Sequence, residues 1–283
     1  MVSAPQRREA ARYLQSHYEV SERRACATVK LSRSVHRYQA RRPDQSALRR
    51  HIRQIAHTRV RYGYLRIWTL LRRQGVAVNK KRVHRLYCLE GLQLRPKRPR
   101  RHVSAARRQR PTRTVKGLND AWSLDFVAGE LAGRSKFRML PIVDVCSREC
   151  LGIEVGQRLG AENVVAALER IRRTRGAPRR LFCDNGSEFQ SRLVDLWAYQ
   201  HQVTVEFSRP GKPTDNAHIE SFNGRFRDEC LNTHWFADLT EARTVIEAWR
   251  TDYNESRPHM ALNSMTPLEY ANELRLEGQK SAS

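Results

Sequence analysis

The spacing of hydrophobic positions changes partway along the chain. Up to about residue 94 the apolar residues recur at helical intervals among many polar ones. In residues 1–45, Ser21 and Ser32 each precede a short helical stretch, which predicts two capped helices in a helix-turn-helix outline. An ordinary basic helical hairpin is the alternative interpretation of this segment.

Residues 46–94 form a second helical segment. Three helices are expected there, because three apolar faces at helical spacing are separated by turn signals. Gly75 and Gly91 are placed to end helices, and Asn79 is placed to cap the third helix. The N-terminal region is therefore predicted to be all-α.

From residue 119 onward the pattern becomes α/β. Short apolar runs predict strands at residues 122–127, 136–145, 149–155, 180–183 and 203–207, the second and third of which form a hairpin. A helix is expected over residues 161–175, and Ser187 with Gln190 predicts a capping box for another. Thr266 and Glu269 bracket a further helix start. This order predicts a mixed five-stranded sheet flanked by helices over residues 119–283.

Charge divides the chain at nearly the same place. The protein has 53 Lys and Arg against 29 Asp and Glu, a net charge of +24. Residues 1–118 carry 32 basic and 5 acidic side chains, a net of +27, whereas residues 119–283 carry 21 and 24, a net of −3. Within the first part, residues 95–118 hold ten basic residues, no acidic residue and three prolines. We expect this stretch to be a basic linker that binds nucleic acid, with a nuclear-localisation signal as the alternative.

Several protein classes are excluded or disfavoured at this point. No apolar run approaches the ~18–20 residues that span a bilayer, and the first 15 residues lack the apolar core of a secretory signal. The six cysteines form no CxxC pair, which favours a reducing compartment over a disulfide framework. His84 and Cys88 are four residues apart, but no second pair stands at zinc-finger distance. We therefore expect a cytoplasmic protein with no membrane partner.

Three carboxylates occupy positions that suggest chemistry. Asp125 lies within an apolar strand pattern, Asp184 directly follows another, and Glu220 lies on a helix beside a polar stripe. Each alone has an ordinary explanation, as a strand charge, a turn residue or a solvated glutamate. Gathered together, they would raise one another's pKa unless divalent cations kept them ionised. Hard oxygen ligands suit two Mg²⁺ or Mn²⁺ ions, which serve phosphoryl transfer.

Asp184 and Glu220 are separated by 35 residues, the spacing of D,D(35)E transposases and retroviral integrases. The segments WSLDFV, VDVCSRE, CDNGSEF, RPGKPTDNAHIESFNGRFRDECLN and WRTDYNESRPHMAL resemble the large bacterial insertion-sequence family that is encoded in two overlapping reading frames. The chain is similar to the second-frame product of that family.

The resemblance implies a ribonuclease-H-like catalytic core and assigns Asp125, Asp184 and Glu220 as catalytic and metal-binding residues. It further implies transposase activity at element ends, a first-frame protein partner, and an oligomer that brings two DNA ends together. A member of this family is expected to associate with the bacterial nucleoid. One departure is Val145, where family members commonly have a second Asp after Asp144.

Basic and polar residues at helix ends and turns are candidates for contacts with double-stranded DNA. They are Arg33, Arg37, Arg72, Arg73, Lys80, Lys81, Arg82, Arg85, Lys97, Arg98, Lys212, Asn216, Asn223 and Arg227. Ordinary solvation of a helix surface is the alternative for each. His218 is expected to have a structural role, and Trp249, Tyr253 and Arg257 are expected to pack a helix against the core. Two other functions stay open: a non-catalytic DNA-binding regulator, and a ribonuclease-H-type nuclease.

Overall fold

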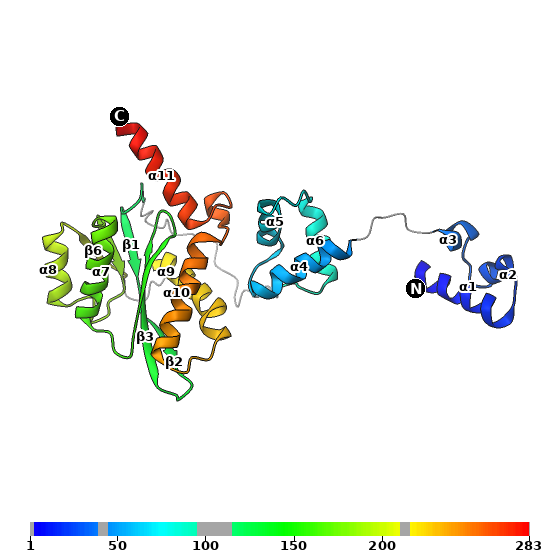
Figure 1. Ribbon diagram of the computed structural model, residues 1–283, viewed down its shortest axis with the longest axis horizontal. Helices are drawn as coiled ribbons and strands as arrows, with labels where there is room; N and C mark the ends of the chain where they lie inside the picture. The colour runs from blue at the N-terminus through cyan, green and yellow to red at the C-terminus, as the bar shows by residue number, and fades with distance from the viewer. Residues whose placement is uncertain (1–2, 39–44, 95–114, 210–215, 283) are drawn as a thin grey trace. The chain divides into compact units, whose positions relative to one another are not determined.

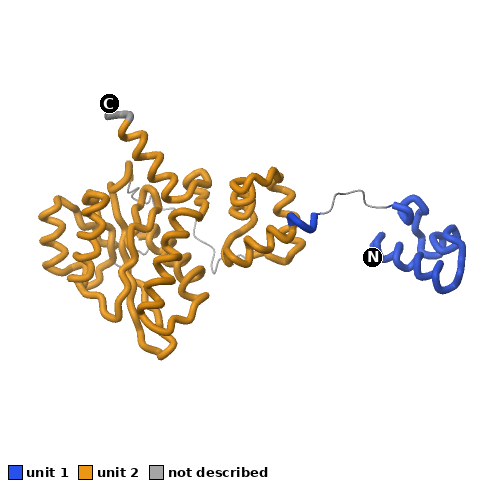
Figure 2. The backbone as a smooth tube through the Cα atoms, viewed as in Figure 1, with its two compact units in different colours: residues 1–48 blue, residues 49–283 orange. Residues whose placement is uncertain are grey.

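The computed structural model describes residues 3–38, 45–94, 115–209 and 216–282 (Figure 1). The chain separates into two compact units, residues 1–48 and residues 49–283, which are coloured in Figure 2. Each unit is described here by itself. No helix in the described ranges combines the length and the apolar character that crossing a membrane requires.

Residues 3–38, the part of the first unit described before residue 45, contain three helices. They are α1 Ala4–Tyr18, α2 Glu22–Thr28 and α3 Arg33–Arg37. Ser21 and Ser32 cap α2 and α3 as predicted, each accepting a hydrogen bond from the backbone amide three residues ahead. The sequence prediction missed α1, because Ala11 is its one buried residue and the helix shows no clear apolar face.

The second helical segment contains the three predicted helices. They are α4 Ser46–Thr58, α5 Tyr64–Arg73 and α6 Lys80–Leu89. Gly75 and Gly91 follow α5 and α6 with φ values of +80° and +68°, a left-handed conformation that glycine adopts without strain. Asn79 caps α6 by accepting a hydrogen bond from the amide of Lys81 over 2.8 Å. This segment belongs to the same compact unit as the α/β region.

The α/β region is built on one mixed sheet. Its strands are β1 Ala121–Leu124, β2 Val127–Glu130, β3 Lys136–Asp144, β4 Cys150–Gly156, β5 Arg180–Cys183 and β6 Thr204–Phe207. β1 is antiparallel to β3 and parallel to β5, β5 is parallel to β6, and β4 forms a hairpin with β3. The sheet confirms the predicted mixed topology.

The first predicted strand is interrupted in the structure. β1 and β2 pair with β3 in one unbroken register, Leu124 opposite Ile142 and Val127 opposite Met139. The two residues between them, Asp125 and Phe126, therefore fall opposite Pro141 and Leu140 of β3. A proline has no N–H to donate to a neighbouring strand. Six strand segments thus replace the five predicted strands, and Asp125 lies in the gap.

Helices cover both faces of the sheet (Figure 1). On one face pack α7 Ala161–Arg175 and α8 Arg192–Gln200; on the other pack α9 Ala217–Glu229 and α10 Leu239–Glu255. The chain continues through two 3₁₀ turns, Leu231–Thr233 and Met260–Leu262, and ends in α11 Pro267–Ala282. Side chains alternate along β1, so Trp122 and Leu124 enter the α7–α8 core. Val127 enters the core under α9 and α10.

Two predicted helix starts have different outcomes. The capping box at Ser187 and Gln190 is wrong: those residues form a turn, and α8 begins at Arg192 with Ser191 as its cap. The competing signal was a second serine four residues downstream, in front of the same apolar face. Thr266 and Glu269 do form reciprocal hydrogen bonds at the start of α11, as expected.

Candidate active site

Asp125 and Asp184 occupy matching positions at the ends of two neighbouring parallel strands. The register of β1 and β5 pairs Ala121 with Arg180 and Ser123 with Phe182. Continuing this register by two residues places Asp125 level with Asp184. Because the strands are parallel, both carboxylates emerge at the same edge of the sheet.

Alternation along the strand directs Asp125 toward α9. Ser123 and Asp125 lie on the face opposite to Trp122 and Leu124. Ser123 contacts the residue just before α9, and Asp125 contacts a residue of α9 itself. Asn223 Nδ2 donates a hydrogen bond to Asp125 Oδ2 over 2.8 Å. The strand acid is thereby joined directly to the helix.

The start of α9 is also fastened to β1. Ser123 Oγ donates a hydrogen bond to Asn216 Oδ1, and Asn216 Nδ2 donates one to the carbonyl oxygen of Leu124 over 3.2 Å. Asn216 is the residue immediately before α9, and it is buried with 6% exposure. The helix therefore begins at a position set by the two residues that precede Asp125.

Glu220 lies in the first turn of α9, on the exposed side of the helix. The opposite side of α9 buries Ile219, Phe222 and Phe226 against the sheet. Asn223 lies three residues after Glu220, so the two side chains project from neighbouring positions one helical turn apart. The turn that contacts Asp125 thus directly follows the turn that presents Glu220.

The electrostatic environment of Asp125 connects the three acids. Burial, and then the charges of Asp184 and Glu220, raise the pKa of Asp125 from its usual 3.8 to about 6. Hydrogen bonds from the backbone and from Asn223 oppose this rise. Among the described residues, none of the three acids forms an ion pair with a basic side chain. An ionised Asp125 therefore lacks a compensating cation.

The described residues contain no group of three His, Cys, Asp or Glu side chains arranged so that it could hold a metal ion. The pKa of Asp125 nevertheless responds to both other acids, so the three are electrostatic neighbours. The donor set consists of hard carboxylate oxygens, and a divalent cation would remove the repulsion that raises the pKa of Asp125. In chemistry and charge the residues fit such an ion.

The loop after β5 is held by a cluster that the sequence prediction did not include. Phe126 stacks on Phe189 with ring centroids 5.1 Å apart, and the Arg138 guanidinium lies 4.0 Å from the Phe126 ring centroid. Arg138 also pairs with Glu188, which lowers the pKa of that carboxyl. The sequence contained one signal for this cluster: an aromatic residue follows each of two candidate acids, Phe126 after Asp125 and Phe189 shortly after Asp184.

Asp144 and His218 lie in the motif segments quoted from the sequence, and both have structural roles. Asp144 is fully buried and accepts hydrogen bonds from the amides of Asn119 and Ser147, both at the end of the sheet. His218 contacts Arg148, and burial followed by the charge of Arg148 lowers the pKa of His218 to about 4. His218 is therefore uncharged at neutral pH.

Several predicted DNA contacts have other partners in the structure. Asn216 and Asn223 are buried, with 6% and 7% exposure, and bond to β1 and Asp125; their assignment to a DNA-facing surface is corrected accordingly. Their polar groups form buried hydrogen bonds, which the polar stripe in the sequence of the helix could not show. Arg227 is exposed and donates to the carbonyl oxygen of Ala128 over 3.4 Å. Three further candidates, Lys97, Arg98 and Lys212, lie outside the described residues.

The remaining candidates for DNA contact differ in whether their side chains have partners within the protein. Arg37 pairs with Glu22, and Arg73 donates to Glu269 and to the carbonyl oxygen of Ser264, so both have intramolecular partners. Arg33 is exposed on α3, and Arg72 lies over the Trp68 ring. The four α6 candidates are all exposed, and none of them pairs with an acidic side chain in the described part of the chain: Lys80, Lys81, Arg82 and Arg85.

The aromatic residues of α10 pack against α9, as expected. Trp249 contacts the rings of Phe222 and Phe226, with centroids 5.6 and 5.0 Å away. Tyr253 meets Phe222 edge-on at 5.0 Å. This aromatic cluster supports the buried side of the helix that carries Glu220.

Comparison with known proteins agrees with this architecture. Residues 116–213 and 201–267 match integrase core domain families, and residues 43–100 match an HTH-like domain. A protein of insertion element IS407 from Burkholderia multivorans is 46% identical over 255 residues, covering 89% of this chain and 91% of that protein. The chain belongs to the insertion-sequence transposase family. A protein of insertion element IS476 from Xanthomonas euvesicatoria is 40% identical, covering 99% of this chain and 81% of that relative.

The fold of this transposase family member is the ribonuclease-H-like integrase core. A chain of the simian T-cell lymphotropic virus intasome in complex with PP2A regulatory subunit B56 gamma aligns with a TM-score of 0.50 and 14% identity. The alignment covers 78% of this chain and 74% of that one. At this identity the likeness concerns the fold alone, and it agrees with the resemblance inferred from the sequence.

Proposed function

We propose that this chain is the catalytic subunit of a DNA transposase that cuts and joins strands at the ends of its own element, with Asp125, Asp184 and Glu220 as catalytic residues. The observation that carries the proposal is the register of the parallel strands β1 and β5, which brings Asp125 level with Asp184, next to the helix that carries Glu220. The raised pKa of Asp125, to which Asp184 and Glu220 contribute, agrees with this proximity. Acids that destabilise one another's charge at one edge of a sheet are a feature of functional sites. Family membership supplies the reaction class.

The three carboxylates would hold two Mg²⁺ or Mn²⁺ ions, which supply charge stabilisation to attacking and leaving oxygens when bound. In the first reaction, a water oxygen bonds to phosphorus at the element end, and the bond from phosphorus to the 3′ oxygen breaks. This frees the 3′-OH of the element and leaves a 5′-phosphate on the flanking DNA. In the second reaction, that 3′ oxygen bonds to a target phosphorus, and the target 3′-OH leaves. Asn223 orients the Asp125 carboxylate during both reactions.

Recognition of double-stranded DNA is assigned to the HTH-like module. α6 follows α5 across a short turn and presents exposed Lys80, Lys81, Arg82 and Arg85. This is the position of the second helix of a helix-turn-helix, whose first residues contact base edges. Two element ends must be joined to one target, so we further propose that the chain acts as a homo-oligomer. From the resemblance to the two-frame family we also propose a first-frame protein as partner.

The test uses the purified full chain, a duplex carrying the end of its own element, and Mn²⁺. We expect strand cleavage and joining by the wild type, and loss of both with Asp184→Asn. The control is Glu162→Gln, an exposed carboxylate at the start of α7 that should leave activity unchanged. DNA binding without cleavage or joining would favour a regulator instead, and hydrolysis of an RNA–DNA hybrid without joining would favour a nuclease.

A further inference from the structure

A buried ion pair fixes the end of α9 that lies farthest from the proposed active site. Arg257 Nη2 donates a hydrogen bond to Glu229 Oε1 over 2.7 Å, and its Nη1 contacts the second carboxylate oxygen. Glu229 is the last residue of α9, and Arg257 is 2% exposed. Breaking a buried pair leaves an uncompensated charge, so the two residues stay together.

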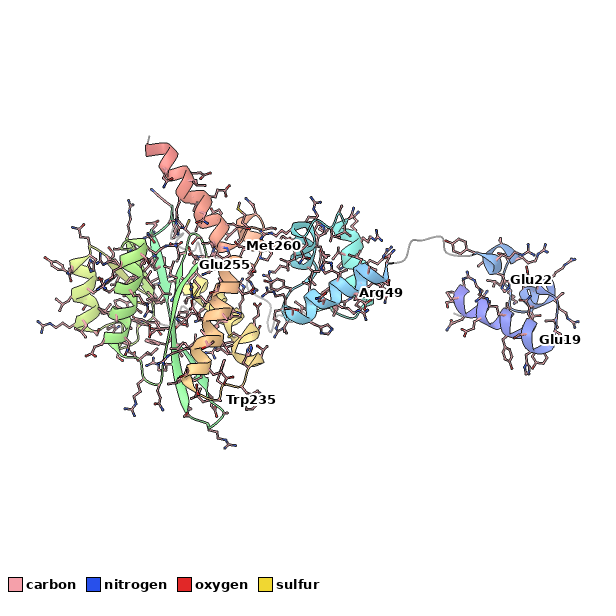
Figure 3. The ribbon with its side chains drawn as sticks, viewed as in Figure 1. Glu19, Glu22, Arg49, Trp235, Glu255 and Met260 are labelled. Carbon is pink, nitrogen blue, oxygen red and sulfur yellow. The ribbon has the colours of Figure 1, made fainter. Side chains whose placement is uncertain are left out.

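The same guanidinium contacts the HTH-like module. Arg257 Cζ lies 5.2 Å from the ring centroid of Tyr62, a residue of the turn between α4 and α5 that is 3% exposed. A cation over a buried aromatic ring is a favourable contact. Figure 3 labels Glu255 and Met260, which bracket the segment carrying Arg257. The module thus touches the residue that holds α9.

Neighbouring contacts hold that turn in place. Arg66 Nε donates to the carbonyl oxygen of Pro258 over 3.3 Å, and Arg59 pairs with Asp252 of α10. A cavity of about 380 Å³ lies beside the pair, lined in part by Thr58 and Trp249. The junction is therefore held by directional polar contacts beside a cavity.

α9 is a rigid connection between this junction and Glu220. Its 13 residues span about 20 Å. Asn216 fastens the start of the helix to β1, and Asn223 fastens its second turn to Asp125. Glu229 fastens the last turn to Arg257. A short helix held at both ends moves as a unit.

Pure stability is a weak reason for such a pair. Among the described residues, Arg257 Nε and His259 Nε2 are buried without hydrogen-bond partners. Partly satisfied buried polar groups stabilise less than apolar packing of the same volume. We infer that the Arg257–Glu229 pair fixes one arrangement of the HTH-like module against α9, and this role explains why two charged residues are buried at the junction.

We propose that Arg257 is a positioning residue that couples the HTH-like module, through Tyr62, to the placement of Glu220 on α9. This inference rests on the proposed function for the role of Glu220. The module, when held on DNA, stabilises the contact of Tyr62 with Arg257 and so the position of α9. Engagement of the element end would thereby favour the active arrangement of the three acids.

The first experiment separates DNA binding from catalysis in the full chain. Tyr62→Leu removes the aromatic face and keeps an apolar side chain, whereas Tyr62→Phe keeps the face and is the matched control. We expect Tyr62→Phe to behave as the wild type, and Tyr62→Leu to lose joining rate at saturating DNA, by about tenfold, because small misplacements of reacting groups are costly. A loss of affinity with an unchanged saturating rate would assign Tyr62 to DNA binding and overturn the coupling.

A double variant removes the charge without leaving one partner unpaired. Arg257→Met combined with Glu229→Gln should reduce the joining rate as Tyr62→Leu does. Adding Tyr62→Leu to that background should cause no further loss, because all three residues act through one chain of contacts. Independent, additive losses would refute the proposal.

Hydrogen exchange supplies a readout that needs no activity. Tyr62→Leu should speed exchange of the α9 backbone amides and leave those of β3 and β4 unchanged. Unchanged α9 exchange would refute the coupling whether or not the wild type joins DNA. If the wild type neither cuts nor joins, the proposed function fails, and the exchange result still decides whether the module holds α9.

Discussion

Asn223 donates a hydrogen bond to Asp125 across 2.8 Å, one helical turn after Glu220. This contact links a strand acid to the helix that carries the third acid. The amide favours the ionised carboxylate without adding another negative charge. Its Oδ1 atom is buried and has no partner among the described residues. The contact makes Asn223 a positioning residue for Asp125.

Replacing Asn223 should therefore affect metal use before DNA binding. We expect Asn223→Ala to slow strand joining and to raise the Mn²⁺ concentration that gives half the maximal rate. Asn223→Asp should instead lower that concentration, because a fourth carboxylate adds repulsion that a bound divalent cation relieves. Ser221→Ala, at an exposed position of the same helix, is the control. An unchanged Mn²⁺ requirement in both Asn223 variants would contradict this role.

The ionised Asp125 carboxylate should lower the free energy of unfolding when no metal is bound. Its pKa in the folded protein, about 6, exceeds the usual 3.8, so the folded state loses stability as pH rises through that interval. In EDTA at pH 7.5 we expect Asp125→Asn to have a higher Tm than the wild type, measured by circular dichroism. Adding Mg²⁺ should raise the Tm of the wild type and not of the variant. A lower Tm of the variant in EDTA would count against the repulsion.

Gly186 sets the space around Asp184. Its amide donates to Asp184 Oδ1 over 3.0 Å, and a Cβ on Gly186 would lie 3.0 Å from that oxygen and 3.3 Å from Glu188 Oε2. We expect Gly186→Ala to displace the Asp184 carboxylate and to lower the joining rate. Gly224→Ala is the matched control, since a Cβ there meets no atom within 4 Å and alanine stabilises a helix by roughly 0.5–1 kcal/mol. Equal activity of the two variants would disprove the crowding argument.

The salt dependence of DNA binding should distinguish paired from unpaired arginines. Arg85 is exposed on α6, whereas Arg73 is paired with Glu269. Arg85→Ala should lower the slope of log affinity against log salt by about 1, as expected for one phosphate contact. Arg73→Ala should leave the slope unchanged. Fluorescence anisotropy over a salt series measures both, and a larger effect of Arg73 would reverse the assignment.

His259 should make folding stability depend on pH. Burial, and then Arg257, Arg225, Arg66 and Arg148, lower the pKa of His259 to about 3. Because the folded pKa lies below the usual 6.5, its contribution is complete above pH 6.5 and is lost as pH falls toward 3. The loss amounts to at most about 1.4 kcal/mol per pH unit.

Urea unfolding of the wild type and of His259→Gln between pH 7 and pH 4 measures this contribution. The variant should show a shallower fall in the free energy of unfolding. His57→Gln, at an exposed position of α4, should keep the wild-type dependence. Parallel curves for the wild type and His259→Gln would show that His259 does not titrate as its burial implies.

Local patterns were sufficient for most of the elements. The helix over residues 161–175 and the strand over residues 180–183 agree with the structure, because their apolar periodicity and end signals coincide. α1 was missed because a helix that buries one alanine leaves no periodic signal. The break at Asp125 was missed because it depends on Pro141 of another strand, which no local window around Asp125 contains.

The sequence by itself determined the class of protein and predicted the three acids, since a basic half, an α/β half and the spacing of Asp184 and Glu220 are all properties of order along the chain. Only the tertiary structure decided which polar residues serve those acids. Asn216 and Asn223 share the helical stripe of Glu220, and the same stripe fits a DNA-facing surface or a buried contact with β1 equally well. Helical periodicity reports which residues share a face. What that face meets depends on contacts between residues distant in sequence, such as Asn223 with Asp125 and Arg257 with Tyr62.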